Sequence, residues 1–444
     1  MMLLYNILFL LGGALGLPFF VVRALTLEKR KTTIFKRLTM RPSCLPLPAR
    51  PIWIHALSVG EVLSSATLVK KLKKDYPEHP LVFSVSTRSG YEIAHKSLAG
   101  ETECIFFFPY DIVWITRNII RHIAPSVFFL IETDLWPNFL NELNKQGVPA
   151  ILVNGRISSA SYKRYKKAAS FARYIMGKFA CCCMQTETDA GRIISMGAPR
   201  DRVYVTGNIK FDQPPLCIPA EEIEKLRVSL KIGSKSRVFV AGSTHEGEEG
   251  ALLSCFKALR RSFSDVVLVV APRDPVRAGR LQQMFAAAEF AAVLKTEVDK
   301  LTRGLPDVVI VNTIGELRRL YAIADVVFVG KSLVNLGGQN PLEPAALKKP
   351  ILFGPYMFNF ELIARMLLEN GAAVEVRNDA ELSRQVKALL LDGKHSRSMG
   401  ERAYEVFCMN RGAVDRTLRV AESFLRPAFR TSSEGRDHDP SAPK

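Results

Sequence analysis

The chain has 444 residues, of which 48% are hydrophobic and 23% are charged. This composition is too apolar for an intrinsically disordered protein and too charged for a protein that crosses a membrane many times. The length exceeds what one hydrophobic core usually serves, so we expect two domains. Lysine and arginine outnumber aspartate and glutamate by 61 to 43, a formal charge of +18. Such a charge indicates an anionic partner: nucleic acid, an acidic membrane surface or a phosphorylated substrate.

The N-terminus predicts a membrane anchor. Residues 1–22 carry no charged side chain, and the stretch from Arg23 to Arg41 then has seven basic residues and one acid. A helix of that length could span the roughly 30 Å hydrocarbon core of a bilayer. The basic flank predicts that the rest of the chain stays on the cytoplasmic side. We therefore expect an anchor over residues 1–22 and a basic juxtamembrane segment over 23–49. The alternative is a hydrophobic helix packed on the domain itself.

From residue 50 onward, short apolar runs alternate with longer amphipathic stretches, which predicts parallel sheets covered by helices on both faces. One of the apolar runs holds the consecutive Cys181–Cys183, which we expect in a buried strand because cysteine acts as a small hydrophobe. A break with three prolines separates two such series. The predicted segments are a first α/β domain over 50–212, a linker over 213–230, a second α/β domain over 231–410, a helix over 411–429 that can return to the first domain, and a disordered tail over 430–444.

Three charged residues of the first series follow predicted strands, where doubly wound sheets bind ligands. Glu61 falls at the start of a helix, where it can serve the helix N-terminus or take a proton from a substrate hydroxyl. Glu132 directly follows the apolar run 127–131, a costly position for a carboxylate unless it is bonded to backbone amides or used in catalysis. Lys210 lies between apolar residues and can counter a phosphate or carboxylate, or form an ion pair with Asp212.

The second series has a glycine-rich segment that favours a nucleotide. Gly337 and Gly338 allow close approach of the backbone, and Pro341 is favoured in the first turn of a helix. The helix N-terminus would then face a phosphate, and Glu343 would accept from ribose hydroxyls. No second histidine supports a metal site at His245, so we expect no metal.

Together these loops resemble the 3-deoxy-D-manno-octulosonic acid (Kdo) transferases of lipopolysaccharide synthesis. The resemblance runs from the N-terminus to about residue 412 and combines several motifs. They include HALSVGE at 55–61, ETDLWPN at 132–138, NGRIS at 154–158, TGNIKFD at 206–212, STHEGEE at 243–249 and GGQNPLEPAA at 337–346.

Membership of this family implies a GT-B fold, in which two Rossmann-like domains face a cleft. It implies CMP-Kdo as donor, a lipid A precursor (lipid IVA) as acceptor, no cofactor, and a place at the cytoplasmic face of the cell inner membrane. The general base of the family corresponds to Glu61, and its transition-state stabilisers correspond to Glu132 and Lys210. The CMP contacts correspond to Pro272, Arg273, Ile314, Gly315, Glu316, Asn340, Pro341, Leu342 and Glu343.

The sequence also departs from the family pattern beside the predicted nucleotide site. Gln339 replaces the usual histidine of the glycine-rich motif, and Lys331 stands where a second glycine is usual. Asp274 and Val276 interrupt the usual run after Pro272 and Arg273. These changes affect details of donor contact and leave the predicted reaction class standing.

The stretch between Arg156 and Thr186 contains no acid. It predicts docking onto anionic inner-membrane lipids and the phosphates of the acceptor, or else a solvated basic helix. The nearest rival function is another GT-B enzyme that uses a UDP-sugar, either a transferase or an epimerase. The other rival is a non-catalytic basic membrane-associated protein. We expect no nucleic-acid partner, because no module with interleaved basic and aromatic residues is present.

Overall fold

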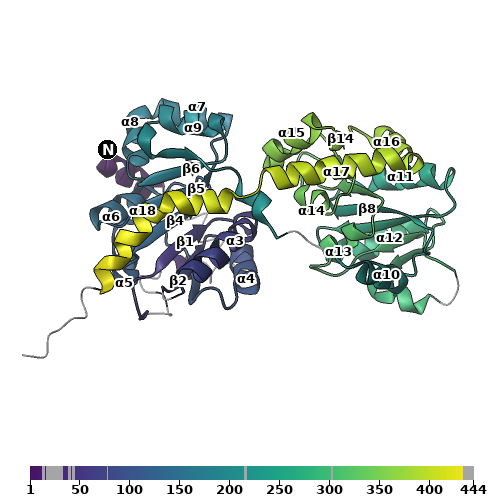
Figure 1. Ribbon diagram of the computed structural model, residues 1–444, viewed down its shortest axis with the longest axis horizontal. Helices are drawn as coiled ribbons and strands as arrows, with labels where there is room; N and C mark the ends of the chain where they lie inside the picture. The colour runs from purple at the N-terminus through teal and green to yellow at the C-terminus, as the bar shows by residue number, and fades with distance from the viewer. Residues whose placement is uncertain are drawn as a thin grey trace, which may run out of the picture. The chain divides into compact units, whose positions relative to one another are not determined.

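The computed structural model describes residues 1–12, 16, 34–38, 42, 46–77, 79–214, 218–301 and 304–433. The chain forms two compact units, one built from Met1–Gln213 with Arg411–Lys444 and the other from Pro214–Asn410. In each unit, helices cover both faces of a seven-stranded parallel sheet (Figure 1). The prediction of two parallel-sheet α/β domains is confirmed.

The first sheet has the strand order β3-β2-β1-β4-β5-β6-β7. The order in which successive strands are added reverses between β1 and β4, which are direct, parallel neighbours paired from Ile52↔Val127 to His55↔Leu130. The loops that follow these two strands therefore lie side by side, where doubly wound sheets place their ligands. The strands are β1 Ile52–Ala56, β2 Leu81–Val85, β3 Cys104–Phe107, β4 Val127–Ile131, β5 Ala150–Gly155, β6 Cys181–Met184 and β7 Val203–Val205.

Apolar side chains on both faces of this sheet explain why its strands are buried. Alternate residues of β1 enter different cores: Ile54 packs with α3 and α18, and Trp53 packs with α5 and α6. The predicted burial of Cys181–Cys183 in a strand is confirmed in β6. The helices of this unit are α3 Val59–Asp75, α4 Arg88–Ser97, α5 Val113–Ile123, α6 Pro137–Lys145, α7 Ser159–Lys167, α8 Ala169–Met176, α9 Glu187–Ser195 and α18 Ala413–Ser433.

The C-terminal helix α18 belongs to the first unit although it follows the second in sequence (Figure 1). The carboxylate of Asp212 accepts the backbone N–H groups of Gly412 and Val414 at 2.5 Å each, so it holds the start of this helix. Arg416 Nε donates to the carbonyl of Thr206 at 2.8 Å. The helix extends to Ser433, beyond the predicted limit at 429, and residues 434–444 of the predicted tail lie outside the described residues.

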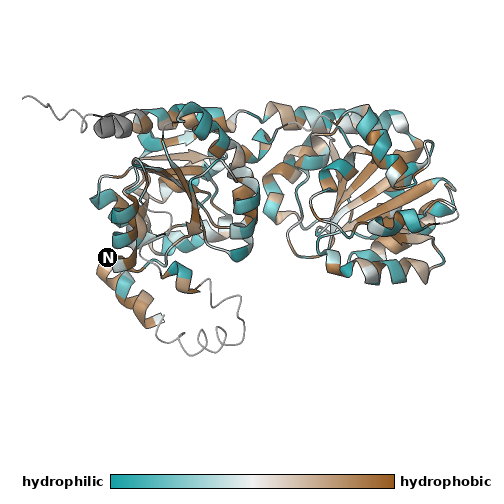
Figure 2. Cartoon of the chain, turned by 90° about the horizontal axis from the view of Figure 1, so that it is seen from below, coloured by the Kyte–Doolittle hydropathy of each residue, from teal (hydrophilic) through white to brown (hydrophobic). Residues whose placement is uncertain are grey.

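The second sheet has the strand order β10-β11-β9-β8-β12-β13-β14. The order in which successive strands are added reverses between the parallel neighbours β8 and β12. Its strands are β8 Arg237–Thr244, β9 Val266–Pro272, β10 Ala292–Leu294, β11 Val308–Ile310, β12 Val326–Val329, β13 Ile351–Phe353 and β14 Ala373–Glu375. Its helices are α10 Ala220–Ser229, α11 Glu249–Arg260, α12 Ala278–Ala286, α13 Leu317–Ala322, α14 Leu342–Ala345, α15 Glu361–Glu369, α16 Asp379–Leu391 and α17 Gly393–Met409. Figure 2 shows hydrophobic strands between helices of mixed hydropathy in both units.

The predicted N-terminal membrane anchor is not supported. No helix in the described parts of the chain is long and apolar enough to cross a membrane. Residues 2–12 are helical, whereas 13–15, 17–33, 39–41 and 43–45 of the predicted anchor and basic segment lie outside the described residues.

The helix at residues 2–12 packs on the first unit, as the alternative interpretation of this segment expects. Tyr5 donates its hydroxyl to Asp111 Oδ2 at 2.9 Å, and its ring stacks on Phe171 with 5.6 Å between centroids. Asn138 Nδ2 donates to Asn6 Oδ1 at 2.6 Å. These polar contacts fix one face of the helix, because a buried carboxylate such as Asp111 needs hydrogen-bond donors.

Candidate active site

Glu61 lies in the first turn of α3, directly after the loop that leaves β1. Its Oε2 accepts the backbone N–H of Leu57 at 2.6 Å, and its Oε1 accepts the hydroxyl of Ser58 at 3.1 Å. The carboxylate therefore reaches back over the helix start, as the acid of a capping box does. Only 7% of Glu61 is exposed, so this short loop holds a largely desolvated carboxyl group.

The surroundings of Glu61 raise its pKa to about 8. Burial is the largest cause, the charge of Glu132 adds to it, and the charge of Asp134 adds a smaller part. The hydrogen bonds from Leu57 and Ser58 act in the opposite direction because they favour the charged form. A carboxyl group with a pKa near neutral can both accept and release a proton at physiological pH, which a general base requires.

Glu132 and Lys210 form an ion pair, with 2.9 Å between Lys210 Nζ and Glu132 Oε1. Asn154 Nδ2 lies 3.5 Å from the same oxygen, and Asn154 Oδ1 accepts the N–H of Ile209. Glu132 and Asn154 both have a φ of 58°, a backbone conformation that non-glycine residues rarely adopt. Residues in such conformations persist where surrounding contacts enforce them, and they often lie at functional sites. The predicted alternative partner, Asp212, holds α18 instead.

Asp134 completes a polar cluster with the buried His55. The indole Nε1 of Trp136 donates to Asp134 Oδ2 at 2.9 Å, and His55 Nε2 lies 3.8 Å from the same oxygen. His55 Nδ1 lies 3.0 Å from Ser84 Oγ, and the imidazole stacks on Phe108 with 3.8 Å between centroids. Burial lowers the pKa of the His55 imidazole and Asp134 opposes this shift. The cluster thus places a second carboxylate close to Glu61.

The three catalytic residues predicted for the first domain therefore lie in one neighbourhood of the first unit. The sequence does not identify two of their neighbours, Asp134 and Asn154, as important, although both occur inside the motifs that carry the family resemblance. From its place at the end of an apolar run, His55 is expected to be a strand-end residue with satisfied hydrogen bonds, and the structure agrees with this only in part. Its Nδ1 has a partner at the strand end, but within the described residues its buried Nε2 has no hydrogen bond.

In the second unit, the predicted nucleotide contacts follow β9, β11 and β12. Arg273 comes directly after β9, and its N–H donates to the carbonyl of Thr244 at 2.9 Å. Glu343 lies near Arg273, Arg318 and Asn340. Burial raises the pKa of Glu343, and these three neighbours oppose the shift. Arg273, Asn340 and Glu343 thus influence one another directly.

The loop between β12 and α14 passes very close to its neighbours. A Cβ atom on Gly337 (φ 97°) would lie 2.3 Å from Asn359 Nδ2, and one on Gly338 (φ 73°) would lie 2.3 Å from the sulfur of Met357. Glycine is thus required at both positions. The helix that follows Pro341 is only the four residues of α14. One turn sums few peptide dipoles, and the prediction that this helix N-terminus faces a phosphate stays a prediction.

The remaining predicted contacts lie after β11. Ile314 is 83% exposed, and Gly315 has a φ of 92°. Glu316 accepts from Lys295 Nζ and from the hydroxyl of Thr313, at 2.7 Å each. Burial opposes ionisation, but these two hydrogen bonds and the charge of Lys295 hold the pKa of Glu316 below its usual value. Glu316 thus carries a fixed negative charge next to two exposed groups.

A buried carboxylate joins the two central loops of the second unit. Glu248 is fully buried, and it accepts the N–H groups of His245 (2.8 Å), Lys331 (2.6 Å), Ser332 (2.8 Å) and Leu333 (2.9 Å). It thereby connects the end of β8 with the end of β12. Lys331 has a φ of 61°, a conformation that glycine adopts without steric strain.

The comparisons with known proteins agree with this arrangement. A profile described as 3-deoxy-D-manno-octulosonic-acid transferase (kdotransferase) matches residues 29–213, and a profile of group 1 glycosyl transferases matches 224–406. The 3-deoxy-D-manno-octulosonic acid transferase of Haemophilus influenzae is 32% identical over 379 residues, which cover 85% of this chain and 88% of that protein. This chain belongs to the Kdo transferase family. It is therefore a glycosyltransferase.

Two further relatives extend the comparison. A bifunctional glycosyltransferase/methyltransferase of Fusobacterium nucleatum is 36% identical over 388 residues, 87% of this chain and 59% of that protein. The crystal structure of Anabaena HepE in complex with UDP and glucose matches with a TM-score of 0.56 at 13% identity, over 85% of this chain and 99% of that one. At this identity the likeness concerns the fold alone, which is GT-B-like.

Proposed function

We propose that this Kdo transferase moves Kdo from CMP-Kdo to the lipid A precursor lipid IVA, in lipopolysaccharide core synthesis, with inversion at the anomeric carbon. The observation that carries the proposal is the buried Glu61, whose pKa is raised to about 8 beside the Glu132–Lys210 ion pair. Family membership supplies the reaction class, and this carboxyl group supplies a base suited to it.

In the proposed reaction, Glu61 accepts the proton of a primary hydroxyl of the acceptor while that oxygen forms a bond to the anomeric carbon of Kdo. The bond between that carbon and the phosphate oxygen breaks, and CMP leaves with the electron pair. Glu61 is suited to this step because its ionised form is destabilised by burial and by Glu132. Accepting a proton relieves that cost.

Glu132 and Lys210 stabilise the charges that develop during transfer. The sugar gains positive character at its anomeric carbon, and a nearby carboxylate lowers the energy of such a species, by analogy with glycoside hydrolysis. The ammonium group of Lys210 pairs with Glu132 and adds a cation able to counter a departing phosphate. The left-handed backbone at Glu132 fixes the direction of this carboxylate.

The CMP part of the donor is bound by the residues after β9, β11 and β12 of the second unit. Arg273 provides a positive charge for the single phosphate, and Glu343 is a candidate acceptor for ribose hydroxyls. Gly337 and Gly338 are buried against Met357 and Asn359, so their close packing fixes the course of the loop that leads to Asn340 and Glu343. The other proposed contacts are Pro272, Ile314, Gly315, Glu316, Asn340, Pro341 and Leu342.

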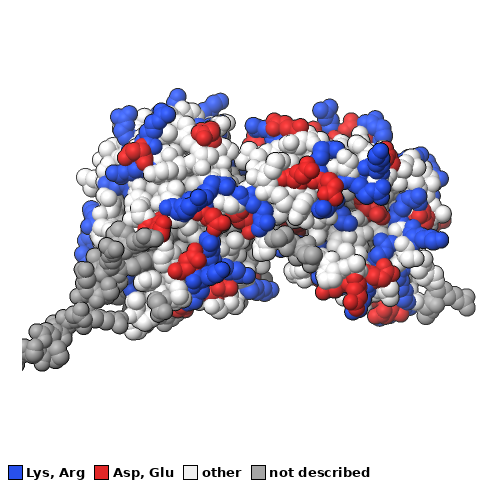
Figure 3. Space-filling model, in the orientation of Figure 1, with Lys and Arg blue, Asp and Glu red and all other residues white. Residues whose placement is uncertain are grey.

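The first unit also meets the membrane that carries the acceptor. The helix at residues 2–12 has an exposed apolar face that includes Leu3 (76% exposed) and Leu8 (60% exposed). In α7 no residue is buried, and its exposed face carries basic side chains (Figure 3). Apolar side chains that insert between lipids and cations that bind anionic headgroups are the two forces that hold peripheral proteins on a bilayer. This association does not require a spanning helix.

The direct test incubates the full chain with freshly generated CMP-Kdo and lipid IVA and analyses the products by mass spectrometry. We expect lipid IVA that has gained Kdo, and a rate lower by about 10²–10⁴ for the Glu61→Gln variant, since general base catalysis contributes about that much. Parallel reactions with UDP-glucose and UDP-N-acetylglucosamine test the rival GT-B functions. Turnover of a UDP-sugar without transfer from CMP-Kdo would refute the proposal.

A further inference from the structure

A cavity of about 410 Å³ lies in the second unit at the edge of the sheet where the strands begin. Its lining includes Arg237, at the start of β8, as well as Asp325, before β12, and Pro350, before β13. The sheet is parallel, so the proposed nucleotide contacts after β9, β11 and β12 lie at its opposite edge. The cavity is therefore distinct from the proposed donor site.

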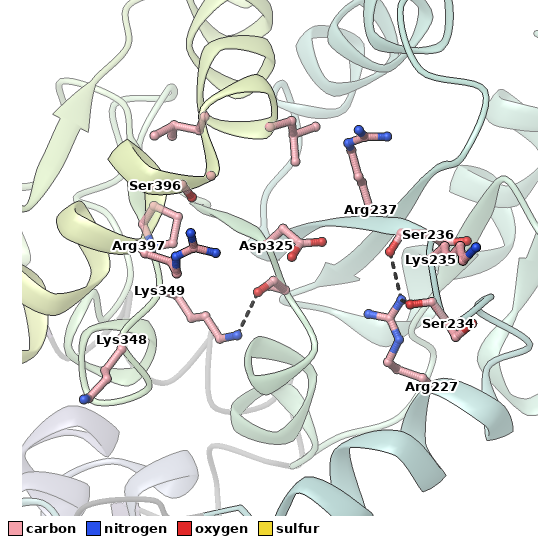
Figure 4. A pocket seen from close by; sticks show the side chains of 15 residues that line it. Arg227, Ser234, Lys235, Ser236, Arg237, Asp325, Lys348, Lys349, Ser396 and Arg397 are labelled. Carbon is pink, nitrogen blue, oxygen red and sulfur yellow. Dashed lines mark hydrogen bonds between the residues drawn. The ribbon is translucent and has the colours of Figure 1, made fainter.

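The lining of this cavity is strongly positive. Figure 4 shows three of its cations, Arg227, Lys349 and Arg397, reaching inward from different segments around Asp325, whereas Lys348 extends away from the centre. Two of the outer cations have acidic partners outside the cavity, Asp265 and Glu401. The basic residues of the lining are Arg227, Lys235, Arg237, Lys348, Lys349 and Arg397, and the single acidic one is Asp325.

Two of these three cations, Arg227 and Lys349, are held in place but not neutralised. Arg227 Nη2 donates to the carbonyl oxygens of Gly233 at 2.7 Å and Ser236 at 2.8 Å, and Lys349 Nζ donates to the carbonyl of Ala324 at 2.8 Å. Carbonyl oxygens orient a cation without cancelling its charge. Neither residue has a carboxylate within ion-pair distance in the part of the chain that the structure describes.

The charges around Lys349 indicate that the cavity lacks a balancing anion. Burial lowers the pKa of its ammonium group, Asp325 raises it, and the charge of Arg227 lowers it again. Asp325 is the single acid among the basic residues of the lining, so the cavity keeps a net positive charge that an entering anion would balance. Arg397 is exposed at the rim, and its guanidinium has no ion pair or hydrogen bond with any described residue. It is free to bind such an anion in bidentate fashion.

We propose that this cavity binds a phosphorylated small molecule from solution, with its phosphate held by Arg227, Lys349 and Arg397. The carboxylate of Asp325 can only accept hydrogen bonds, so it selects a ligand that also carries hydroxyl groups, such as a sugar phosphate. The volume lies within the roughly 300–1,000 Å³ of small-molecule sites. Leu389 and Pro350 give the cavity an apolar wall against which a sugar ring can pack.

Isothermal titration of the full chain with ribose 5-phosphate tests this site, with uncharged ribose as the comparison. We expect saturable binding of the phosphate ester only. Arg397→Ala should weaken it about tenfold, since a hydrogen bond to a charged group contributes about that factor. The matched control is Lys387→Ala, which removes an equally exposed cation of α16 outside the cavity and should bind as the unchanged protein does. Arg273→Ala should also retain binding, which excludes the proposed donor site as the source.

Absence of saturable binding, or equal weakening by Arg397→Ala and Lys387→Ala, would overturn the proposal. Asp325→Asn gives a second test, because it removes the repelling charge while keeping an oxygen that can accept from Val238 N. This variant should bind inorganic phosphate more tightly than the unchanged protein. Sedimentation with vesicles containing phosphatidic acid distinguishes a lipid source. If Arg397→Ala reduces vesicle binding while no soluble phosphate binds, the ligand is a headgroup and the proposal fails.

Discussion

The ammonium group of Lys210 donates to Glu132 Oε1 at 2.9 Å, although 78 positions separate the two residues in the chain. This contact joins the loop after β4 to the short helical turn after β7. The charge of Glu132 in turn helps to raise the pKa of Glu61. The ion pair and the proposed base are therefore one electrostatic system, and a change in one should be measurable in the other.

Removing the positive charge of Lys210 should shift the pH dependence of kcat/KM to higher pH. In Lys210→Met the charge of Glu132 is no longer balanced, so the ionised form of Glu61 becomes less favourable and its pKa rises further above 8. The base acts when deprotonated, so the rising limb of kcat/KM against pH should shift to higher pH, and the rate at pH 7 should fall. Lys210→Arg keeps the charge and should leave the limb near its original position. An unshifted limb in Lys210→Met would separate the ion pair from the base.

Neutralising the carboxylate of Asp134 should shift the pH dependence of kcat/KM in the opposite direction, to lower pH. Asp134 raises the pKa of Glu61 by its charge, so Asp134→Asn should lower that pKa and move the same limb to lower pH. The Asn side chain can still accept from Trp136 Nε1, which keeps the local contact. The shift should be small, because Asp134 contributes least among the causes of the raised pKa. Limbs that move in the same direction in both variants would contradict this electrostatic account.

The positions of these residues could be predicted from the sequence, but their pairing could not. Glu61, Glu132 and Lys210 each follow an apolar run, and parallel strands end at one edge of a sheet. The ion pair between Lys210 and Glu132 could not be predicted, because Asp212 lies only two positions from Lys210 and is the nearer acidic partner in the sequence. Only the fold shows that Asp212 is used to hold the start of α18.

The backbone conformation of two site residues and the length of α14 could not be predicted from the sequence either. Nothing in the sequence indicates that Glu132 and Asn154 adopt a positive φ, since contacts made elsewhere in the chain enforce it. The proline at 341 correctly indicates a helix start, but the sequence does not show that α14 ends after four residues, at Ala345. The uncharged N-terminus predicts a membrane anchor, and it does not reveal that Tyr5 and Asn6 give the helix polar partners on the first unit.

Glu61→Gln should also make the protein more stable at high pH. A carboxyl group whose folded pKa is about 8 holds its proton in the native state at pH values where the unfolded chain, with a pKa of 4.5, has released it. The native state therefore binds more protons, and the free energy of unfolding falls as pH rises from 4.5 through 8. Glutamine does not ionise, so the variant should gain on the order of 1–3 kcal/mol at pH 8 and much less at pH 4. Urea unfolding at the two pH values measures this difference.

Glu248→Ala should destabilise the second unit strongly. The fully buried carboxylate accepts four backbone N–H groups, and its removal leaves those donors without partners in the core. Each unsatisfied buried donor costs about 1–3 kcal/mol, so we expect a loss of several kcal/mol in the free energy of unfolding. Glu248→Gln keeps one accepting oxygen and should lose less. Matching stabilities for the Ala variant and the unchanged protein would show that these loops can find other partners.

Membrane binding should depend on two separable surfaces of the first unit. The variant Lys163→Glu/Lys166→Glu/Lys167→Glu reverses three exposed charges of α7. At low salt it should reduce sedimentation with vesicles that contain anionic lipid, by several-fold for each cation. It should have little effect on sedimentation with neutral vesicles. Leu3→Ser/Leu8→Ser removes exposed apolar side chains of the helix at residues 2–12 and should reduce binding to both kinds of vesicle. The charge-matched control, Arg384→Glu/Lys387→Glu/Lys394→Glu, reverses three exposed cations of the second unit that lie outside both surfaces. Equal losses from the control and from the α7 variant would mean that total charge, rather than α7, attracts the membrane.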